Sequence, residues 1–268
     1  MLFTNFNCGP TGVTQLNGVI YVTCVNYQSV AANKVFAYRS DLLLTQNVIA
    51  IPGLKFPYDI DASSSGSCLY VADDLCVWRV NVTESGYNVS KFVSGFSVRS
   101  LSVATDGRVI MNQYGRHLVI YSHNGMLLET IDMPPFYDVQ YATATPSNTL
   151  LICSSYSGWH VSEVQKGGLM DILHSYGSYS NRYYDLAMDT SGSGLLFVAD
   201  GARGVVLLDK QLNLVSTQII PNPPTTGYSP QRVSFDAVTG TLVVADLYIV
   251  NVYNFQVVTS TLTTTTIL

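Results

Sequence analysis

The tripeptide Val-Ala-Asp ends three separate apolar segments of this 268-residue chain, at residues 71–73, 198–200 and 244–246. Degenerate copies occupy residues 22–24, 111–113 and 152–154, and the spacings between successive copies are 49, 40, 41, 46 and 46 residues. A period in the forties with several short strands per unit is typical of propeller blades, whereas helical solenoids would show helical spacing. The repeat therefore predicts an all-β protein, a six-bladed β-propeller with four-stranded antiparallel blades.

The strand pattern within the repeats gives the blade boundaries. Each repeat contains apolar runs of about five to seven residues separated by turn residues. The predicted blades form a single domain over residues 1–268 and cover about residues 9–53, 57–95, 98–134, 136–177, 183–221 and 230–265. The outer strand of the last blade must come from residues 257–264 or from residues 2–6, because either choice covers an exposed edge. The Thr-rich C-terminal segment is favoured, since threonine is common in strands.

Charge and hydropathy exclude several classes of function. Lys and Arg total 13 against 18 Asp and Glu, which gives a formal charge of -5. A negative chain repels phosphate backbones, so no nucleic-acid partner is expected. There is no apolar run of about 18 residues and no basic, apolar leader, so neither a membrane span nor a signal peptide is predicted.

The aspartate that closes the tripeptide has a structural explanation. A short carboxylate accepts hydrogen bonds from backbone N–H groups two residues on and so holds a tight turn. We therefore interpret Asp73, Asp200 and Asp246 as turn residues. The alanine before each aspartate is small enough for close packing between neighbouring blades.

The best copies of the repeat carry a resemblance to known propellers. Residues 69–73, 196–200 and 242–246 read Leu-Tyr-Val-Ala-Asp, Leu-Phe-Val-Ala-Asp and Leu-Val-Val-Ala-Asp. In this pattern the chain resembles the NHL-repeat propellers and, more distantly, the gluconolactonase and SMP-30-like propellers, over nearly its whole length. The resemblance implies six blades but no single function, because that superfamily includes protein-binding and RNA-binding scaffolds, lactonases, arylesterases and a zinc-dependent lyase.

The starts of the innermost strands converge at one end of a propeller's channel, and three of them carry Tyr-Asp. The predicted channel-entrance residues are Tyr58, Asp59, Tyr137, Asp138, Tyr184 and Asp185, with Arg99 and Arg232 at the corresponding places in two other blades. Such a ring could hold a cation or a small polar ligand. The alternative is that these acids and arginines only pair with one another across a wet channel.

The resemblance to the SMP-30-like enzymes implies a divalent metal at the second residue of the inner-strand starts. Those positions are Thr11, Tyr58, Arg99, Tyr137, Tyr184 and Gln231, and none is a carboxylate. The aspartates lie one residue later, where a strand side chain points to the opposite face. The four histidines are scattered towards the rim, and no His-Glu-x-x-His or Gly-x-Ser-x-Gly motif occurs. No catalytic or metal-binding residue is therefore predicted, and no cofactor is expected, with calcium the one alternative left open.

The connection between the fourth and fifth blades, residues 177–183, mixes Tyr, Ser, Gly, Asn and Arg. Protein interfaces favour this composition. We predict Tyr179, Arg182 and Tyr183 as a partner-binding loop. Together with the channel entrance, the loop favours an NHL-like, non-catalytic module for protein–protein interaction. The alternative function is a metal-dependent lactonase or esterase of the SMP-30-like class.

Cysteines and sequons bear on the cellular setting. An odd count of five cysteines leaves at least one unpaired. Hairpin spacing places Cys68 and Cys76 too far apart to bond, and a Cys8–Cys24 bond is left open. Two sequons, at Asn81 and Asn88, favour an extracellular setting.

Overall fold

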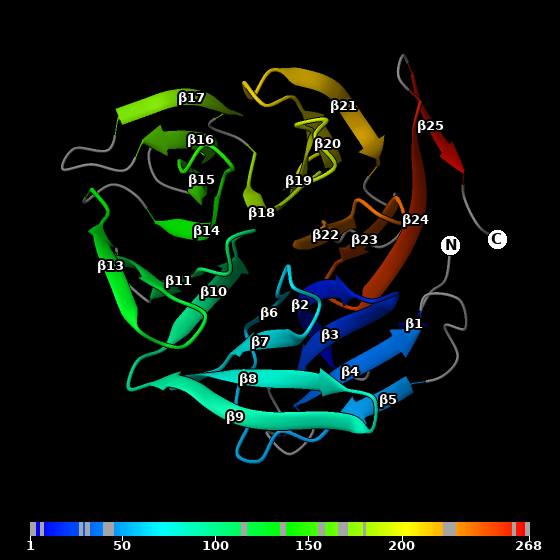
Figure 1. Ribbon diagram of the computed structural model, residues 1–268. Coiled ribbons are helices and arrows are strands. Elements are labelled where there is room, and N and C mark those ends of the chain that lie inside the picture. Colours follow the sequence, from blue (N-terminus) through cyan, green and yellow to red (C-terminus); the bar gives the residue numbers. More distant parts are fainter. Residues whose placement is uncertain are drawn as a thin grey trace.

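The computed structural model describes residues 4–5, 8–26, 29, 33–39, 46–113, 117–134, 138–154, 159–165, 171–178, 181–221, 229–258 and 261–265. These residues form six antiparallel sheets that follow one another around a common centre (Figure 1). They include no helix with the length and apolarity of a membrane span. The predicted six-bladed propeller of mainly four-stranded sheets is confirmed.

Each blade is a meander in which consecutive strands pair from the innermost to the outermost. Blade I is β2 (Gly9–Leu16), β3 (Val19–Val25), β4 (Lys34–Arg39) and β5 (Gln46–Ile49). Blade II is β6 (Asp59–Ala62), β7 (Cys68–Ala72), β8 (Cys76–Thr83) and β9 (Gly86–Ser94). Blade III is β10 (Val98–Val103), β11 (Val109–Gln113), β12 (His117–Tyr121) and β13 (Leu127–Asp132).

The remaining blades follow the same order. Blade IV is β14 (Val139–Ala144), β15 (Leu150–Ser154), β16 (Trp159–Gln165) and β17 (Asp171–Ser178). Blade V is β18 (Tyr183–Met188), β19 (Leu196–Asp200), β20 (Gly204–Leu208) and β21 (Leu214–Ile220). Blade VI begins with β22 (Arg232–Asp236), β23 (Thr241–Ala245) and β24 (Ile249–Val258).

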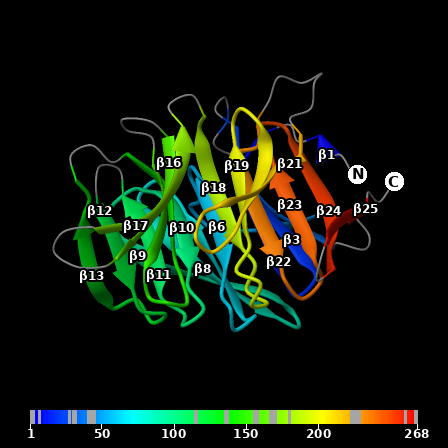
Figure 2. The ribbon, with the colours of Figure 1, turned by 90° about the horizontal axis from the view of Figure 1, so that it is seen from above.

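The two ends of the chain share the outer edge of blade VI. β1 (Thr4–Asn5) pairs with the start of β24, and β25 (Thr261–Thr265) pairs with its end. Figures 1 and 2 show both termini beside β24. From the sequence, either the N-terminal or the C-terminal segment was expected to cover this edge, with the C-terminal one favoured. The structure uses both, because β24 is ten residues long and each segment covers only part of it.

The repeated apolar strand is buried on both sides because a neighbouring blade covers each of its faces. Along β7, Leu69 and Val71 pack against blade I, whereas Cys68, Tyr70 and Ala72 pack against blade III. This is the two-residue alternation of a strand. The described core divides into six apolar clusters, one at each contact between blades. Each blade therefore depends on both neighbours for its core.

The meander gives the propeller two unlike faces. The first and third strands of a blade run in the same direction, so the turn after the first strand and the turn after the third lie at the same end. We call this end the mouth face. The inner strands start at the opposite end, where the blades are also connected, and we call that end the entry face.

Candidate functional site

Six residues, one from each inner strand, form a ring around the channel axis. Each is the pairing partner of the middle residue of its blade's tripeptide. The ring consists of Gly12, Asp59, Ser100, Tyr141, Asp185 and Arg232, opposite Thr23, Ala72, Asn112, Cys153, Ala199 and Ala245. In blades I, III, IV and V the register shifts just before the ring residue, as in a β-bulge. Such a shift re-aims the following side chain. We call this set the axial ring.

Asp59 and Asp185 connect neighbouring blades through the backbone. Asp59 Oδ1 accepts the N–H of Ile60 at 2.9 Å, and its Oδ2 accepts the N–H of Leu101 in blade III, also at 2.9 Å. Asp185 repeats this geometry with the N–H of the next residue and with that of Val233 in blade VI. Each carboxylate therefore satisfies one buried donor of its own strand and one of the next blade.

Asp61 extends the same pattern one step towards the mouth face. Its Oδ1 accepts the N–H of Ala62 at 2.7 Å and the hydroxyl of Thr14 in blade I at 3.1 Å. Its Oδ2 accepts the N–H of Val103 in blade III at 2.8 Å. One side chain thus links three blades, a role that was not predicted from the sequence.

Arg232 carries the positive charge of the axial ring. Its Nε lies 3.7 Å from Asp59 Oδ1 and donates to the carbonyl oxygen of Thr11 at 2.6 Å. Gly12 stands between these two blades in the ring, and a Cβ there would come within 2.6 Å of the Ile60 nitrogen. Only glycine permits so close an approach of two backbones. The missing side chain lets blade II come near enough for Asp59 to meet Arg232.

Burial changes the acidity of these axial groups. It raises the pKa of Asp59 to about 7, against the opposing effects of Arg232 and two N–H donors. Burial also raises the pKa of Asp61 to about 6 and the pKa of Asp185 well above its usual range. The pKa of the Tyr141 hydroxyl is raised strongly by burial and by the nearby aspartates, so this phenol stays protonated. The axis is thus a hydrogen-bonded polar layer whose carboxyl groups keep their protons to a higher pH than exposed carboxyl groups do.

A cavity of about 370 Å³ opens from this layer onto the mouth face. Its walls include Asp59, Asp61, Tyr141 and Asp185, and the turn 236–238 borders its opening. This volume would hold a small ligand or a side chain of a partner. The cavity therefore opens at the end opposite to the predicted channel entrance.

The charged residues that were predicted at the channel entrance fall into two groups in the structure. Asp59, Asp185 and Arg232 come together in the axial ring. Arg99 and Asp138 instead form an ion pair at the entry face, with 3.4 Å between Nη1 and Oδ1 and with both side chains exposed. Asp138 is therefore not a ring residue, which corrects the predicted alignment of blade IV.

The structure describes two of the three tyrosines that were predicted at the channel entrance. Tyr58 and Tyr184 are absent from the described wall of the cavity. Tyr184 packs against the apolar cluster between blades V and VI. Tyr137 lies outside the described residues.

Tyr141 takes the ring position that was predicted for Asp138. The register shift between Val139 and Tyr141 matches the one between Tyr183 and Asp185, so Val139 is the counterpart of Tyr183 and the predicted alignment of blade IV began three residues too early. The ring residue of blade IV could have been found from its distance to the tripeptide along the sequence. The ring residue precedes the middle tripeptide residue by 11 to 14 positions in every blade. Tyr141 precedes Cys153 by 12 positions, whereas Asp138 precedes it by 15.

The predicted partner-binding loop is only partly described. Tyr179 lies outside the described residues, and Arg182 is exposed. Tyr183 is fully buried between blades IV and V, where its hydroxyl accepts a hydrogen bond from Arg203 Nη2 at 3.2 Å. Tyr183 is therefore a core residue and not a surface contact, because β18 begins at this position and needs an apolar ring for blade packing.

The tripeptide aspartates hold backbone turns, although not all in the predicted way. Asp200 and Asp246 each accept the N–H groups two and three residues on, at 2.8 to 3.1 Å, which confirms their role as turn residues. Asp73 instead accepts the N–H of Phe56 at 2.6 Å and the indole N–H of Trp78 at 3.0 Å. Its carboxylate fixes the connection between blades I and II.

The described residues offer no metal centre. They contain no group of three or more His, Cys, Asp or Glu side chains that could hold a metal ion. All four carboxylate oxygens of Asp59 and Asp185 accept backbone N–H groups. Calcium prefers carboxylate and carbonyl oxygens that are free to coordinate it. Among these residues, the calcium alternative therefore finds no group of three acidic side chains to hold the ion.

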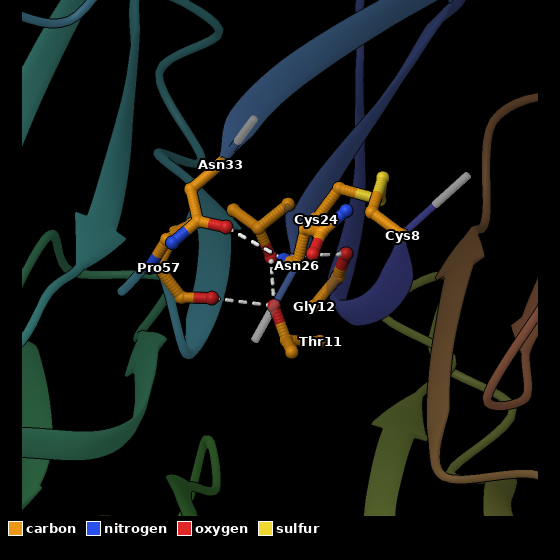
Figure 3. The surroundings of a disulfide bond; sticks show 8 residues. Cys8, Thr11, Gly12, Cys24, Asn26, Asn33 and Pro57 are labelled. Atoms are coloured by element: carbon orange, nitrogen blue, oxygen red, sulfur yellow. Dashed lines mark hydrogen bonds between the residues drawn. A yellow bond between two sulfur atoms is a disulfide. The ribbon is translucent and has the colours of Figure 1, made fainter. Parts of the chain in front are cut away.

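A disulfide joins Cys8, just before β2, to Cys24 in β3 (Figure 3). Close to it, the Thr11 hydroxyl donates to the carbonyl oxygen of Pro57 in the connection between blades I and II. Figure 3 thus shows that this disulfide links the two innermost strands of blade I next to the connection between blades I and II. Cys68, Cys76 and Cys153 are free and buried, as predicted for Cys68 and Cys76.

These features define a class of protein, a six-bladed β-propeller with a polar axis and a cavity open on one face. The chain is similar to the WD40 β-propeller domain of Doa1, with 16% identity and a TM-score of 0.65 over 93% of this chain and 94% of that one. It is similar to streptogramin B lyase, with 12% identity and a TM-score of 0.65 over 94% and 97% of the two chains.

A third solved structure, YCF48 bound to D1 peptide, has 13% identity and a TM-score of 0.59, over 90% of this chain and 76% of that one. At such identities these likenesses show the fold alone. No family model and no curated protein matches the chain.

Proposed function

We propose that this propeller is an NHL-like, non-catalytic binding module that contacts another protein through its mouth face. The observation that carries the proposal is the distribution of exposed apolar side chains. Thirteen large hydrophobic side chains are exposed in the described part of the chain, and nine belong to the mouth face: Tyr87, Met126, Leu127, Leu128, Ile172, Leu173, Leu214, Val215 and Val238. Apolar residues gathered on one face are typical of protein-binding sites.

Among these nine residues, one lines the described wall of the cavity and eight lie at the outer rim. Val238 is 95% exposed and lies in a turn that borders the opening. The other eight stand at the beginnings of β9, β13, β17 and β21, which are the outer strands of four consecutive blades. Within the described residues, each of these strands ends its sheet and has one free edge. A free edge with apolar side chains can accept an added strand from a partner.

The comparisons support this proposal only through the fold. YCF48 was solved bound to D1 peptide, so a propeller similar to this chain binds a peptide. By analogy of fold, we extend peptide or protein binding to the present chain. The residues that would make the contact come from the exposure pattern and not from the relative.

The metal-dependent lactonase or esterase alternative has weaker support. The axial carboxylates already bind backbone N–H groups, and the described residues offer no group that could hold a metal. A hydrolase of that class needs a metal with an open coordination position. The same carboxylates fit a structural role, because each satisfies donors in two blades.

The test first captures a protein partner from the source of the chain and purifies it. The affinity of this partner is then measured for two triple variants of the propeller. Leu128→Glu, Leu173→Glu and Val238→Asp place charges on the mouth face. Leu75→Glu, Leu247→Asp and Tyr248→Asp place charges on exposed positions of the entry face and serve as the control. We expect the mouth-face variant to weaken binding at least about ten-fold, since each buried charge costs free energy. Equal effects of the two variants would contradict the proposal.

A further inference from the structure

A second pocket, of about 280 Å³, lies on the mouth face between blades II and III. Its walls include residues 63–65 in the turn after β6, residues 105–107 in the turn after β10, and His123 after β12. The Ser64 hydroxyl donates to the Thr105 carbonyl oxygen at 2.9 Å, and both residues also line the central cavity. The pocket is therefore a side chamber that adjoins the channel mouth.

Arg79 of β8 lines this pocket and is held in place by its surroundings. Its guanidinium carbon lies 6.0 Å from the centre of the Tyr70 ring, and Nη1 donates to the His123 carbonyl oxygen at 3.1 Å. The Nε of Arg79 is buried and has no hydrogen-bond partner among the described residues. A buried donor of a charged group that lacks an acceptor costs free energy. The side chain thus carries, beside the pocket, an N–H donor that no acceptor among the described residues uses.

The acidic residue in the pocket wall is already neutralised. Asp106 Oδ2 lies 2.7 Å from Arg108 Nε, and its Oδ1 accepts the backbone N–H of Arg108 at 3.1 Å. The ion pairs of the described residues include none between Arg79 and a carboxylate. The hydroxyls of Ser63 and Ser65, also in the wall, lie within hydrogen-bond distance of each other. The pocket thus combines an uncompensated positive charge with hydroxyl donors.

We propose that this pocket binds a tetrahedral oxyanion, the phosphate or sulfate group of a small ligand, between Arg79 and the serine turn. The planar guanidinium presents N–H donors in the arrangement that phosphate and sulfate oxygens match. Serine hydroxyls supply further donors that rotate to suit the anion. The volume exceeds that of the anion and leaves room for a small substituent. This proposal uses residues other than the nine exposed apolar side chains of the proposed protein-binding surface and does not depend on them.

The test is a calorimetric titration of the whole chain with sodium phosphate, sodium sulfate and sodium acetate at constant ionic strength. We expect saturable binding of phosphate and sulfate, and binding about ten- to a hundred-fold weaker in Arg79→Gln, as for loss of a charge-assisted hydrogen bond. Lys210→Gln removes an equal charge from an exposed turn of the same face, outside the pocket, and is the matched control, with affinity changed by less than about two-fold.

A second variant guards against a folding defect in Arg79→Gln. Ser65→Ala leaves the guanidinium in place and is expected to weaken phosphate binding by about three- to ten-fold without a change in unfolding midpoint. The proposal is overturned if the wild type shows no saturable binding of phosphate or sulfate. It is equally overturned if Arg79→Gln binds as the wild type does, or if acetate binds as tightly as phosphate.

Discussion

Arg232 Nε lies 3.7 Å from Asp59 Oδ1, so a residue of blade VI pairs with a residue of blade II past the inner strand of blade I. The position between them in the axial ring is Gly12, which has no side chain to block the contact. Asp59 in turn accepts the N–H of Leu101 in blade III. One glycine, one arginine and one aspartate thus connect four of the six blades at the axis.

Gly12→Ala is expected to destabilise the propeller. The added Cβ would lie 2.6 Å from the Ile60 nitrogen and 2.8 Å from the Asp59 Cα, and backbone atoms cannot move aside as a flexible side chain can. The expected loss is about 1–3 kcal/mol of unfolding free energy, the usual range for overpacking. Urea unfolding measures it. Gly9→Ala is the control, because its nearest contact would be an ordinary 3.4 Å; equal losses in both variants would refute the explanation.

The stability of the protein is expected to fall as pH rises from about 4 to about 7 through the contribution of the axial aspartates. The pKa is about 7 for Asp59 and about 6 for Asp61 in the folded chain. Both values lie above the ordinary pKa of about 3.9, so the folded state binds more protons in this window than the unfolded state does. Stability from these groups is thus present at the acidic end and lost towards neutral pH.

Asp61→Asn is expected to reduce this loss of unfolding free energy between about pH 4 and pH 7 by about 1–2 kcal/mol, because one of the titrating groups is removed. Unfolding free energies at the two ends of the window, for the variant and the wild type, measure the effect. Asp138→Asn alters an exposed carboxylate and is the control. A slope that Asp61→Asn leaves unchanged would show that this carboxyl does not titrate in the window.

Asp200→Ala is expected to cost about 3–5 kcal/mol of unfolding free energy, the range for breaking a buried ion pair by removing one partner. Asp200 is fully buried and pairs with Arg203, with 2.7 Å between Oδ2 and Nη2. Asp138→Ala removes the exposed partner of Arg99 and is expected to cost less than about 1 kcal/mol. Chemical denaturation of both variants tests the contrast, and similar losses would contradict the assignment of Asp200 as a structural residue.

The unreduced protein is expected to react with a thiol reagent under denaturing conditions at three cysteines and, after reduction, at all five. Cys8→Ser is expected to lower stability by about 3 kcal/mol, the range for a loop of this size. Mass spectrometry of the labelled chain counts the thiols. Five reactive thiols before reduction would show that the Cys8–Cys24 bond does not form.

The architecture could be predicted from the sequence because one recurring tripeptide marks the end of the second strand of every blade. The strand before it is apolar on both faces, since it is buried between two blades. The axial site could be predicted only in part. Asp59, Asp185 and Arg232 share one position in the predicted strand starts, whereas in blade IV the Tyr-Asp dipeptide at residues 137–138 was aligned three residues before the true counterpart of Asp185, which is Tyr141. Blade V has the same register shift and its ring residue Asp185 was placed correctly, so the error in blade IV came from matching a local dipeptide and not from the shift itself.

Two further features depend on contacts between distant segments. The role of Asp61 appears only when Thr14 and Val103 of the neighbouring blades are brought to it. The burial of Tyr183 depends on packing between blades IV and V, which the interface-like composition of its loop concealed. Local sequence identifies a strand, but the neighbouring blades decide which of its side chains remain accessible.

The most direct test of the account measures stability and partner binding together on the double variant Asp59→Asn and Asp185→Asn. Each asparagine keeps one acceptor oxygen but presents an amide to the second backbone N–H, so we predict a loss of about 2–4 kcal/mol in unfolding free energy. At a temperature where the variant is still folded, we predict binding of the purified partner within about two-fold of the wild type, because the exposed apolar side chains that are proposed to make the contact are unchanged. Unchanged stability with binding or enzymatic turnover abolished would contradict the account and place the functional site at the axial ring.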